Sequence, residues 1–87
     1  MSRLPAMTYH EVVRHLRAAG FAFDRQAKGS HEIWYNLQTR RRTTVPHHAG
    51  VLSRGTLRAI IREAGLTTKE FLSAGESGEP SDKENRV

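Results

Sequence analysis

The chain has 87 residues, of which 14 are Lys or Arg and 9 are Asp or Glu, and it contains no cysteine. This length predicts one small domain, and the lack of cysteine excludes disulfide bonds and thiolate zinc sites. We expect a cytoplasmic protein with no membrane span, because the N-terminus lacks the apolar segment of a signal peptide and no other stretch is long and apolar enough to span a bilayer.

The net charge of +5 is unevenly distributed along the chain. Residues 74–87 hold four acidic and two basic side chains, a balance of −2, so residues 1–73 carry +7. A positive field of this strength favours a polyanionic partner, such as a nucleic acid, an anionic membrane or an acidic protein. Small proteins can also be basic without binding nucleic acid, so charge alone does not choose among these partners.

A first helix is predicted to begin at Thr8, because Thr8 and Glu11 have the spacing of a capping box. Apolar side chains then recur along one helical face, at Tyr9, Val12, Val13 and Leu16. Gly20 is placed to end this helix in the left-handed conformation.

Three short strands are predicted next, over residues 21–25, 31–36 and 42–45. Pro46 stops the third strand, since it cannot donate a backbone hydrogen bond. The connections are too short for parallel crossovers, so we expect an antiparallel meander. Strand alternation places Trp34 and Tyr35 on opposite faces, with one ring in the core and the other exposed.

Two helices are predicted to follow the strands. The first has an apolar stripe and a closing Gly65; the stripe consists of Leu57, Ile60, Ile61 and Ala64. A second capping-box spacing, between Thr67 and Glu70, predicts a short third helix that runs through Phe71 and Leu72. Residues 73–87 are rich in Gly, Ser, Pro and charge, which predicts a disordered acidic tail.

The expected fold is α+β, a two-layer α-β-β-β-α sandwich with a short extra C-terminal helix. Both amphipathic helices need an apolar surface to cover, and one face of the sheet provides it. The order of elements is that of a double-stranded-RNA-binding domain. We expect residues 1–6 to be an N-terminal leader and residues 7–72 to be the folded domain, followed by the acidic tail.

The run Lys28-Gly29-Ser30-His31 is the strongest candidate for a catalytic segment. Gly29 permits a tight turn that presents His31 at the start of a strand. Lys28 supplies a cation there, and the Ser30 hydroxyl can donate a hydrogen bond to a phosphate. Histidine exchanges protons near neutral pH, so His31 is suited to general acid or base catalysis on an RNA backbone. The alternative is that His31 is an ordinary surface or packing residue.

Basic side chains recur at positions that suit phosphate contacts. They occur on both predicted amphipathic helices, in the first strand and its turn, and in the loop between the second and third strands. The candidates for RNA binding are Arg14, Arg17, Arg25, Lys28, Arg40, Arg41, Arg42, Arg54 and Arg58. Each helical row is equally consistent with an ordinary solvated face.

The other histidines do not predict a metal site. His10 and His15 are five residues apart, on different faces of a helix, and His47 and His48 lie in a loop without a suitably spaced carboxylate. We therefore expect no metal and no other cofactor. Nucleotide hydrolysis, hydride transfer and serine-hydrolase chemistry have no support, because the phosphate-binding, dinucleotide-binding and nucleophile-elbow motifs are missing.

Four segments, in this order, resemble the HicA family of toxin–antitoxin mRNA interferases. They are Ala19-Gly20-Phe21, Lys28-Gly29-Ser30-His31, Val45-Pro46-His47-His48 and the Gly-Thr-Leu-Arg-Ala-Ile-Ile-Arg-Glu-Ala-Gly-Leu run of residues 55–66. The resemblance covers about residues 7–72. The chain departs from the family pattern in its arginine-rich loop at residues 40–42, in Ser53-Arg54 where lysines are common, and in its acidic tail.

The resemblance implies a fold like a double-stranded-RNA-binding domain, cleavage of mRNA without a required metal, and a HicB-type antitoxin that covers the active site. It also implies that the catalytic histidine is His31. The histidine of the family's P-x-H motif falls on His48.

The leading interpretation is a toxin endoribonuclease. If the RNA 2′-OH is the nucleophile, His31 serves as general base, while Lys28, an arginine or the Ser30 hydroxyl stabilises the phosphorane. His48 is a candidate for the second proton-transfer group. Two alternatives stay open: a non-catalytic RNA-binding module, and a basic domain that binds an acidic protein.

Overall fold

The computed structural model describes residues 4–77, which form three helices and three strands. The elements are α1 (Tyr9–Ala18), β1 (Phe21–Gln26), β2 (His31–Asn36), β3 (Arg41–Pro46), α2 (Arg54–Glu63) and α3 (Thr68–Ser77). The strands form one antiparallel sheet in the order β1-β2-β3. The structure confirms the α+β class, the order typical of a double-stranded-RNA-binding domain and the extra C-terminal helix.

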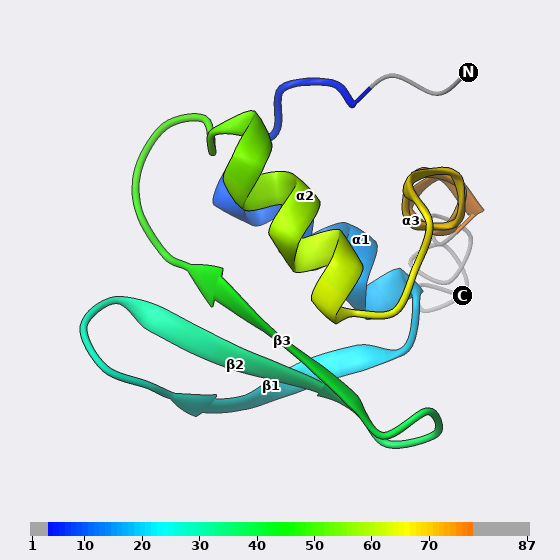
Figure 1. The fold of residues 1–87 in the computed structure, drawn as a ribbon, viewed down its shortest axis with the longest axis horizontal. Helices are drawn as coiled ribbons and strands as arrows, with labels where there is room; N and C mark the ends of the chain where they lie inside the picture. Colours follow the sequence, from blue (N-terminus) through cyan, green and yellow to red (C-terminus); the bar gives the residue numbers. More distant parts are fainter. Residues whose placement is uncertain (1–3, 78–87) are drawn as a thin grey trace, which may run out of the picture.

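The molecule has two layers (Figure 1). Both α1 and α2 lie on the same side of the sheet, α1 against β1 and α2 against β3, and α3 packs on α1. Within residues 4–77 no helix covers the opposite side of the sheet, which we call the open face. None of the helices described is long and apolar enough to cross a membrane.

Local sequence determines where the helices begin and end. The predicted capping box at α1 is present: the Glu11 N–H donates to Thr8 Oγ1 at 3.3 Å, and the Thr8 N–H donates to Glu11 Oε1 at 2.9 Å. Thr67 and Glu70 repeat this exchange at the start of α3, with distances of 3.0 and 2.9 Å. Gly20 ends α1 with a φ of 102°, in the left-handed region as predicted.

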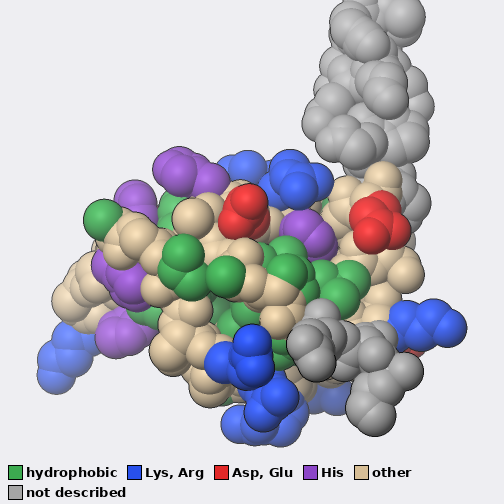
Figure 2. Space-filling view, turned by 90° about the horizontal axis from the view of Figure 1, so that it is seen from above, with side chains coloured by type: hydrophobic (Ala, Val, Ile, Leu, Met, Phe, Trp, Pro, Cys, Tyr) green, Lys and Arg blue, Asp and Glu red, His purple; other side chains and the backbone are tan. Residues whose placement is uncertain are grey.

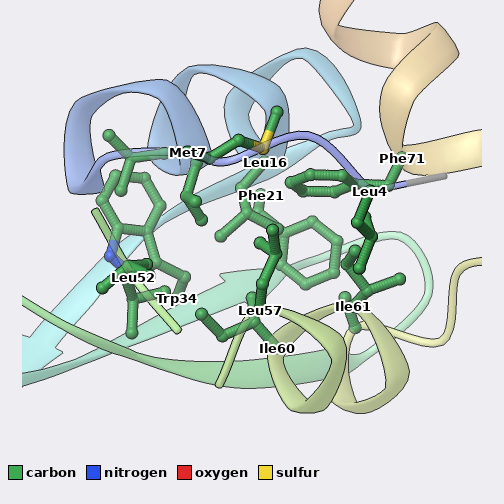
Figure 3. Packing of buried hydrophobic residues seen from close by; sticks show 14 residues of the cluster. Leu4, Met7, Leu16, Phe21, Trp34, Leu52, Leu57, Ile60, Ile61 and Phe71 are labelled. Atoms are coloured by element: carbon green, nitrogen blue, oxygen red, sulfur yellow. The ribbon is translucent and has the colours of Figure 1, made fainter. Parts of the chain in front are cut away.

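The hydrophobic core lies between the helices and the sheet (Figure 3). Trp34 of β2, Leu16 of α1 and Leu57 of α2 are almost completely buried. Phe71 of α3 has no exposed surface, so the extra helix is an integral part of the core. Leu4 is also buried, although it belongs to the segment expected to be a leader.

Helix α3 is longer than the sequence indicates. The acidic tail is expected from residue 73 onward, whereas α3 continues to Ser77. The added turn is held on α1, because Arg14 Nη1 donates to the Gly75 carbonyl at 3.1 Å. The rest of the expected tail, residues 78–87, and the first three residues of the expected leader lie outside the described residues.

Side chains of β2 alternate between the two sides of the sheet. Glu32, Trp34 and Asn36 are buried beneath the helices, while Ile33 and Tyr35 are half-buried on the open face. The prediction that one of the two adjacent aromatic rings enters the core is confirmed, and Trp34 is that ring.

Candidate active site

The turn between β1 and β2 places His31 at the end of the sheet. Gly29 has a φ of 66°, so its backbone adopts the left-handed conformation that favours glycine. Two backbone hydrogen bonds close the turn: the Ala27 N–H donates to the His31 carbonyl at 2.7 Å, and the His31 N–H donates to the Lys28 carbonyl at 3.3 Å. His31 is therefore held at the first position of β2 with its side chain exposed.

The imidazole of His31 has a defined orientation. Its Nδ1 lies 3.1 Å from the Lys28 carbonyl oxygen. A carbonyl oxygen only accepts hydrogen bonds, so Nδ1 carries the proton in this contact. The neutral ring then has its lone pair on Nε2, on the far side from the backbone. Nε2 is thus the atom of His31 that can take a proton from a substrate.

His31 and His48 line one groove, which we call the His31 groove. It has a volume of about 410 Å³, and it is also lined by Thr44, Pro46, Thr56, Ala59, Ile60 and Glu63. The two histidines meet there because His31 pairs with Pro46 in the sheet register, two residues before His48. His48 Nδ1 lies 2.7 Å from the Ala49 carbonyl, so this ring too has its proton on Nδ1 and its lone pair on Nε2.

Glu63 brings a carboxylate to the His31 groove that sequence reasoning missed. Its Oε1 accepts a hydrogen bond from the Thr44 N–H at 3.1 Å, which ties α2 to the edge strand β3. Thr56, Ala59 and Glu63 are spaced at i, i+3 and i+7, so they lie on one face of α2. That spacing is visible in the sequence, but only the packing of α2 on β3 makes it part of a groove.

Lys28 and Ser30 lie in the turn that precedes His31, and both are exposed. The Ser30 carbonyl accepts a hydrogen bond from the His47 N–H at 2.8 Å, which joins this turn to the loop after β3. The two predicted auxiliary residues are therefore at the same end of the sheet as the His31 groove, although neither is among the residues that line it.

The arginine-rich loop lies at the opposite end of the sheet. Arg41 pairs with Asn36 at the last position of β2, whereas His31 occupies the first. Six strand residues span about 17 Å, so Arg40 and Arg41 are not beside His31. Arg42 lies on the open face, where its guanidinium is 4.7 Å from the centre of the Tyr35 ring.

The remaining predicted RNA-binding residues are also spread over the surface, and Figure 2 shows Lys and Arg side chains at several separate places on the visible face. Arg54 and Arg58 lie roughly 140° around α2 from the residues that line the His31 groove, at 100° per residue. On α1, the Arg17 guanidinium is 5.1 Å from the centre of the Trp34 ring. Arg25 forms a surface ion pair of 2.9 Å with Asp24.

A buried carboxylate lies directly after His31 in the chain. Glu32 is 6% exposed, and its Oε1 accepts hydrogen bonds from the Tyr9 hydroxyl at 2.7 Å and from Trp34 Nε1 at 3.1 Å. His47 Nδ1 approaches Oε2 at 3.4 Å. Burial, reinforced by the hydrogen bond to Glu32, raises the pKa of Tyr9 to about 12. Tyr9 therefore stays a neutral donor at physiological pH.

Among residues 4–77, no three His, Cys, Asp or Glu side chains converge in an arrangement that suits a metal ion. The groups gathered at the His31 groove are two imidazoles, a carboxylate and hydroxyls. Such groups are suited to proton transfer and to hydrogen bonding with a phosphate.

A sequence profile of the family described as the HicA toxin of bacterial toxin–antitoxin systems matches residues 9–66, from the start of α1 to just beyond the end of α2. No curated protein sequence matches the chain significantly. Members of the matched family are mRNA interferases that are neutralised by HicB. The match spans two thirds of the chain and includes both histidines of the His31 groove, so the chain belongs to the HicA toxin family.

Proposed function

We propose that this protein is a toxin endoribonuclease that cleaves mRNA, with His31 as its catalytic residue, and that a HicB-like antitoxin neutralises it. The observation that carries the proposal is that His31 and His48 line the same groove. In each ring Nδ1 is hydrogen-bonded to a backbone carbonyl, which leaves Nε2 for proton transfer to or from a substrate. Membership of the HicA toxin family supports the RNA substrate and the antitoxin partner.

In the proposed reaction, Nε2 of His31 takes the proton from a ribose 2′-OH, and the 2′ oxygen attacks the adjacent phosphorus. The bond from phosphorus to the 5′ oxygen breaks, and that oxygen is protonated as it leaves. The products are a 2′,3′-cyclic phosphate and a 5′-OH end. His48, when protonated, is the candidate donor of the second proton, because it lines the same groove.

Lys28 and Ser30 are proposed to stabilise the negative charge of the phosphorane, since both lie in the turn that ends at His31. The arginines have a different part in this proposal. Arg14, Arg17, Arg25 and the residues of the 40–42 loop are too widely distributed to surround one phosphate, so we assign them to the RNA backbone away from the cleaved bond. Arg54 and Arg58 belong to the same distributed group.

We also propose that cleavage requires no metal ion, as the family resemblance implies, and that the protein acts in the cytoplasm, where mRNA is available. An antitoxin that covers the His31 groove would block His31 and His48 together. Because the folded part of the chain is strongly basic, the complementary surface of that antitoxin is expected to be acidic.

The test is cleavage of a long RNA by purified wild-type protein and by His31→Ala, with and without EDTA. Gln38→Ala is a matched control, because Gln38 is exposed in the turn at the opposite end of the sheet. Circular dichroism and RNA binding are measured in parallel for each variant. We expect His31→Ala to lose about 100- to 10,000-fold in cleavage rate, the range typical of general acid or base catalysis, while it folds and binds RNA normally.

Undiminished cleavage by well-folded His31→Ala would overturn the assignment of His31. If even the wild-type protein binds RNA in a salt-sensitive manner without cleaving it, the protein is an RNA-binding module instead. If it neither binds nor cleaves RNA but binds an acidic partner tightly, the basic surface serves protein interaction. Loss of cleavage in EDTA would contradict metal independence.

A further inference from the structure

A second cleft lies beside the His31 groove, and we call it the Tyr9 cleft. It has a volume of about 420 Å³ and is lined by Thr8, Tyr9, His10, His47, His48, Ala49 and Gly50. Its walls are the first turn of α1 and the loop after β3. His48 lines both the cleft and the His31 groove, so the two sites are neighbours.

Aromatic rings dominate the Tyr9 cleft. The rings of Tyr9 and His47 are stacked, with centroids 4.0 Å apart and planes at 14°. His10 adds its ring edge-on to Tyr9, at 5.2 Å and 74°. The His47 side chain remains 53% exposed, so its ring is accessible to a ligand. Figure 2 shows that histidine side chains gather at the left end of the molecule.

The buried Glu32 carboxylate holds these rings in place. One of its oxygens accepts the Tyr9 hydroxyl, and the other faces His47 Nδ1. Glu32 follows His31 on β2, so the same strand presents the proposed catalytic side chain and anchors the wall of the Tyr9 cleft. A site built this way is pre-organised, which reduces the entropy lost when a ligand binds.

The chemistry of the lining favours an unpaired nucleobase. Proteins that recognise single-stranded RNA stack its bases on Tyr and His rings and bind the base edges through hydrogen bonds. The volume lies within the range of about 300–1,000 Å³ that is usual for small-molecule sites. A purely anionic ligand fits less well, because Glu32 lies beneath the cleft and Glu11 is in the same turn of α1, bonded to Thr8.

We propose that the Tyr9 cleft binds one unpaired base of single-stranded RNA, next to the phosphodiester bond that is cleaved at His31, and so determines where the RNA is cut. This inference rests on the proposed function. The position of the cleft favours RNA as the occupant, since His48 lines both the cleft and the His31 groove and an RNA strand bound in the groove would pass close to the cleft.

The test separates binding from cleavage by using His31→Ala protein throughout the binding measurements. Short unpaired oligonucleotides of A, C, G or U are titrated against His31→Ala alone and against His31→Ala combined with His47→Ala, His47→Phe or Gln38→Ala. Oligonucleotides with one abasic position serve as the second probe. Circular dichroism verifies that each protein is folded.

We expect unequal affinities for the four sequences. We also expect His47→Ala to weaken binding by about 5- to 150-fold, the range that stacking of one base supplies. His47→Phe should recover most of that loss, because it retains a ring, and Gln38→Ala should change nothing. In the protein with His31 intact, His47→Ala should also redistribute the cut sites in a long RNA.

The inference would be overturned if intact and abasic oligonucleotides bind with equal affinity and His47→Ala changes neither affinity. That result would leave the assignment of His31 untouched. If His47→Ala lowers RNA affinity only below neutral pH, and by the same factor for intact and abasic RNA, the cleft is a phosphate site. That result would also overturn the inference. If His47→Ala weakens only the complex with the antitoxin, the cleft is a protein-docking surface. If the wild type binds these sequences selectively but never cleaves, the proposed function fails while the base site stands.

Discussion

Replacement of Glu32 tests how the site is held together. Glu32→Ala removes the acceptor of two donors, the Tyr9 hydroxyl and Trp34 Nε1. Trp34 is 1% exposed, so its N–H is left buried without a partner, which costs about 1–3 kcal/mol. Tyr9 is only half-buried and regains water, so its lost bond costs about 1 kcal/mol. Together the free energy of unfolding should fall by about 2–4 kcal/mol.

Glu32→Gln is the matched variant, because its side-chain carbonyl can still accept from both donors. It loses the charge that strengthens these bonds, so the expected loss is about 1 kcal/mol. Urea unfolding followed by fluorescence measures both variants, and Trp34 is the single tryptophan in the chain, so the probe lies at the site of the change. Equal stability of Glu32→Ala, Glu32→Gln and the wild type would refute the reasoning.

Three further predictions concern Tyr9, α3 and the arginines. In Tyr35→Phe protein, Tyr9 is the only tyrosine, and its ultraviolet absorbance should titrate with a pKa of about 12. Because the pKa of Tyr9 is raised above its unfolded value of about 10, the free energy of unfolding should fall as the pH rises from about 10 to 12. A midpoint of the absorbance titration near pH 10 would contradict the burial of Tyr9. Gly75→Ala should lower the free energy of unfolding by about 1–3 kcal/mol, because a methyl group there overlaps the buried His15 ring, and unchanged urea unfolding would disprove that contact. Arg58→Ala should reduce the slope of log K for RNA binding against log salt concentration by about 1, because one phosphate contact is lost, and it should leave the cut sites unchanged. Titration at several salt concentrations measures the slope, and mapping of the RNA ends locates the cut sites. Altered cut sites would place Arg58 at the reaction centre.

The sequence predicts much of the fold because the deciding signals are local. The capping boxes at Thr8 and Thr67 each join residues three positions apart, and Gly20 ends α1 through its own backbone conformation. Short connections between strands leave only an antiparallel meander. The turn at Gly29 and the position of His31 at the start of β2 follow from the same kind of local information.

The remaining features depend on contacts between distant parts of the chain. Glu32 is an acidic residue in a strand, and its burial becomes favourable only because partners from α1 and the loop after β3 surround it. Glu63 joins the His31 groove only once α2 lies on β3. The last turn of α3 has a Gly- and Ser-rich sequence that predicts disorder, and it is helical because Gly75 packs on α1.

The separation of residues 40–42 from His31 follows from the predicted meander. These residues come nine to eleven positions after His31, and most of β2 lies between them. The connection of an antiparallel hairpin lies where the first strand ends, so Arg40 and Arg41 lie at the opposite end of the sheet from His31.

The central claim is that His31 transfers a proton during RNA cleavage. The most direct measurement is the single-turnover rate of cleavage at one mapped site in a short RNA, for the wild type, His31→Ala and Gln38→Ala at saturating protein. We predict that His31→Ala is slower by about 100- to 10,000-fold at equal RNA affinity, while Gln38→Ala matches the wild type. Equal rates for His31→Ala and the wild type would contradict the claim.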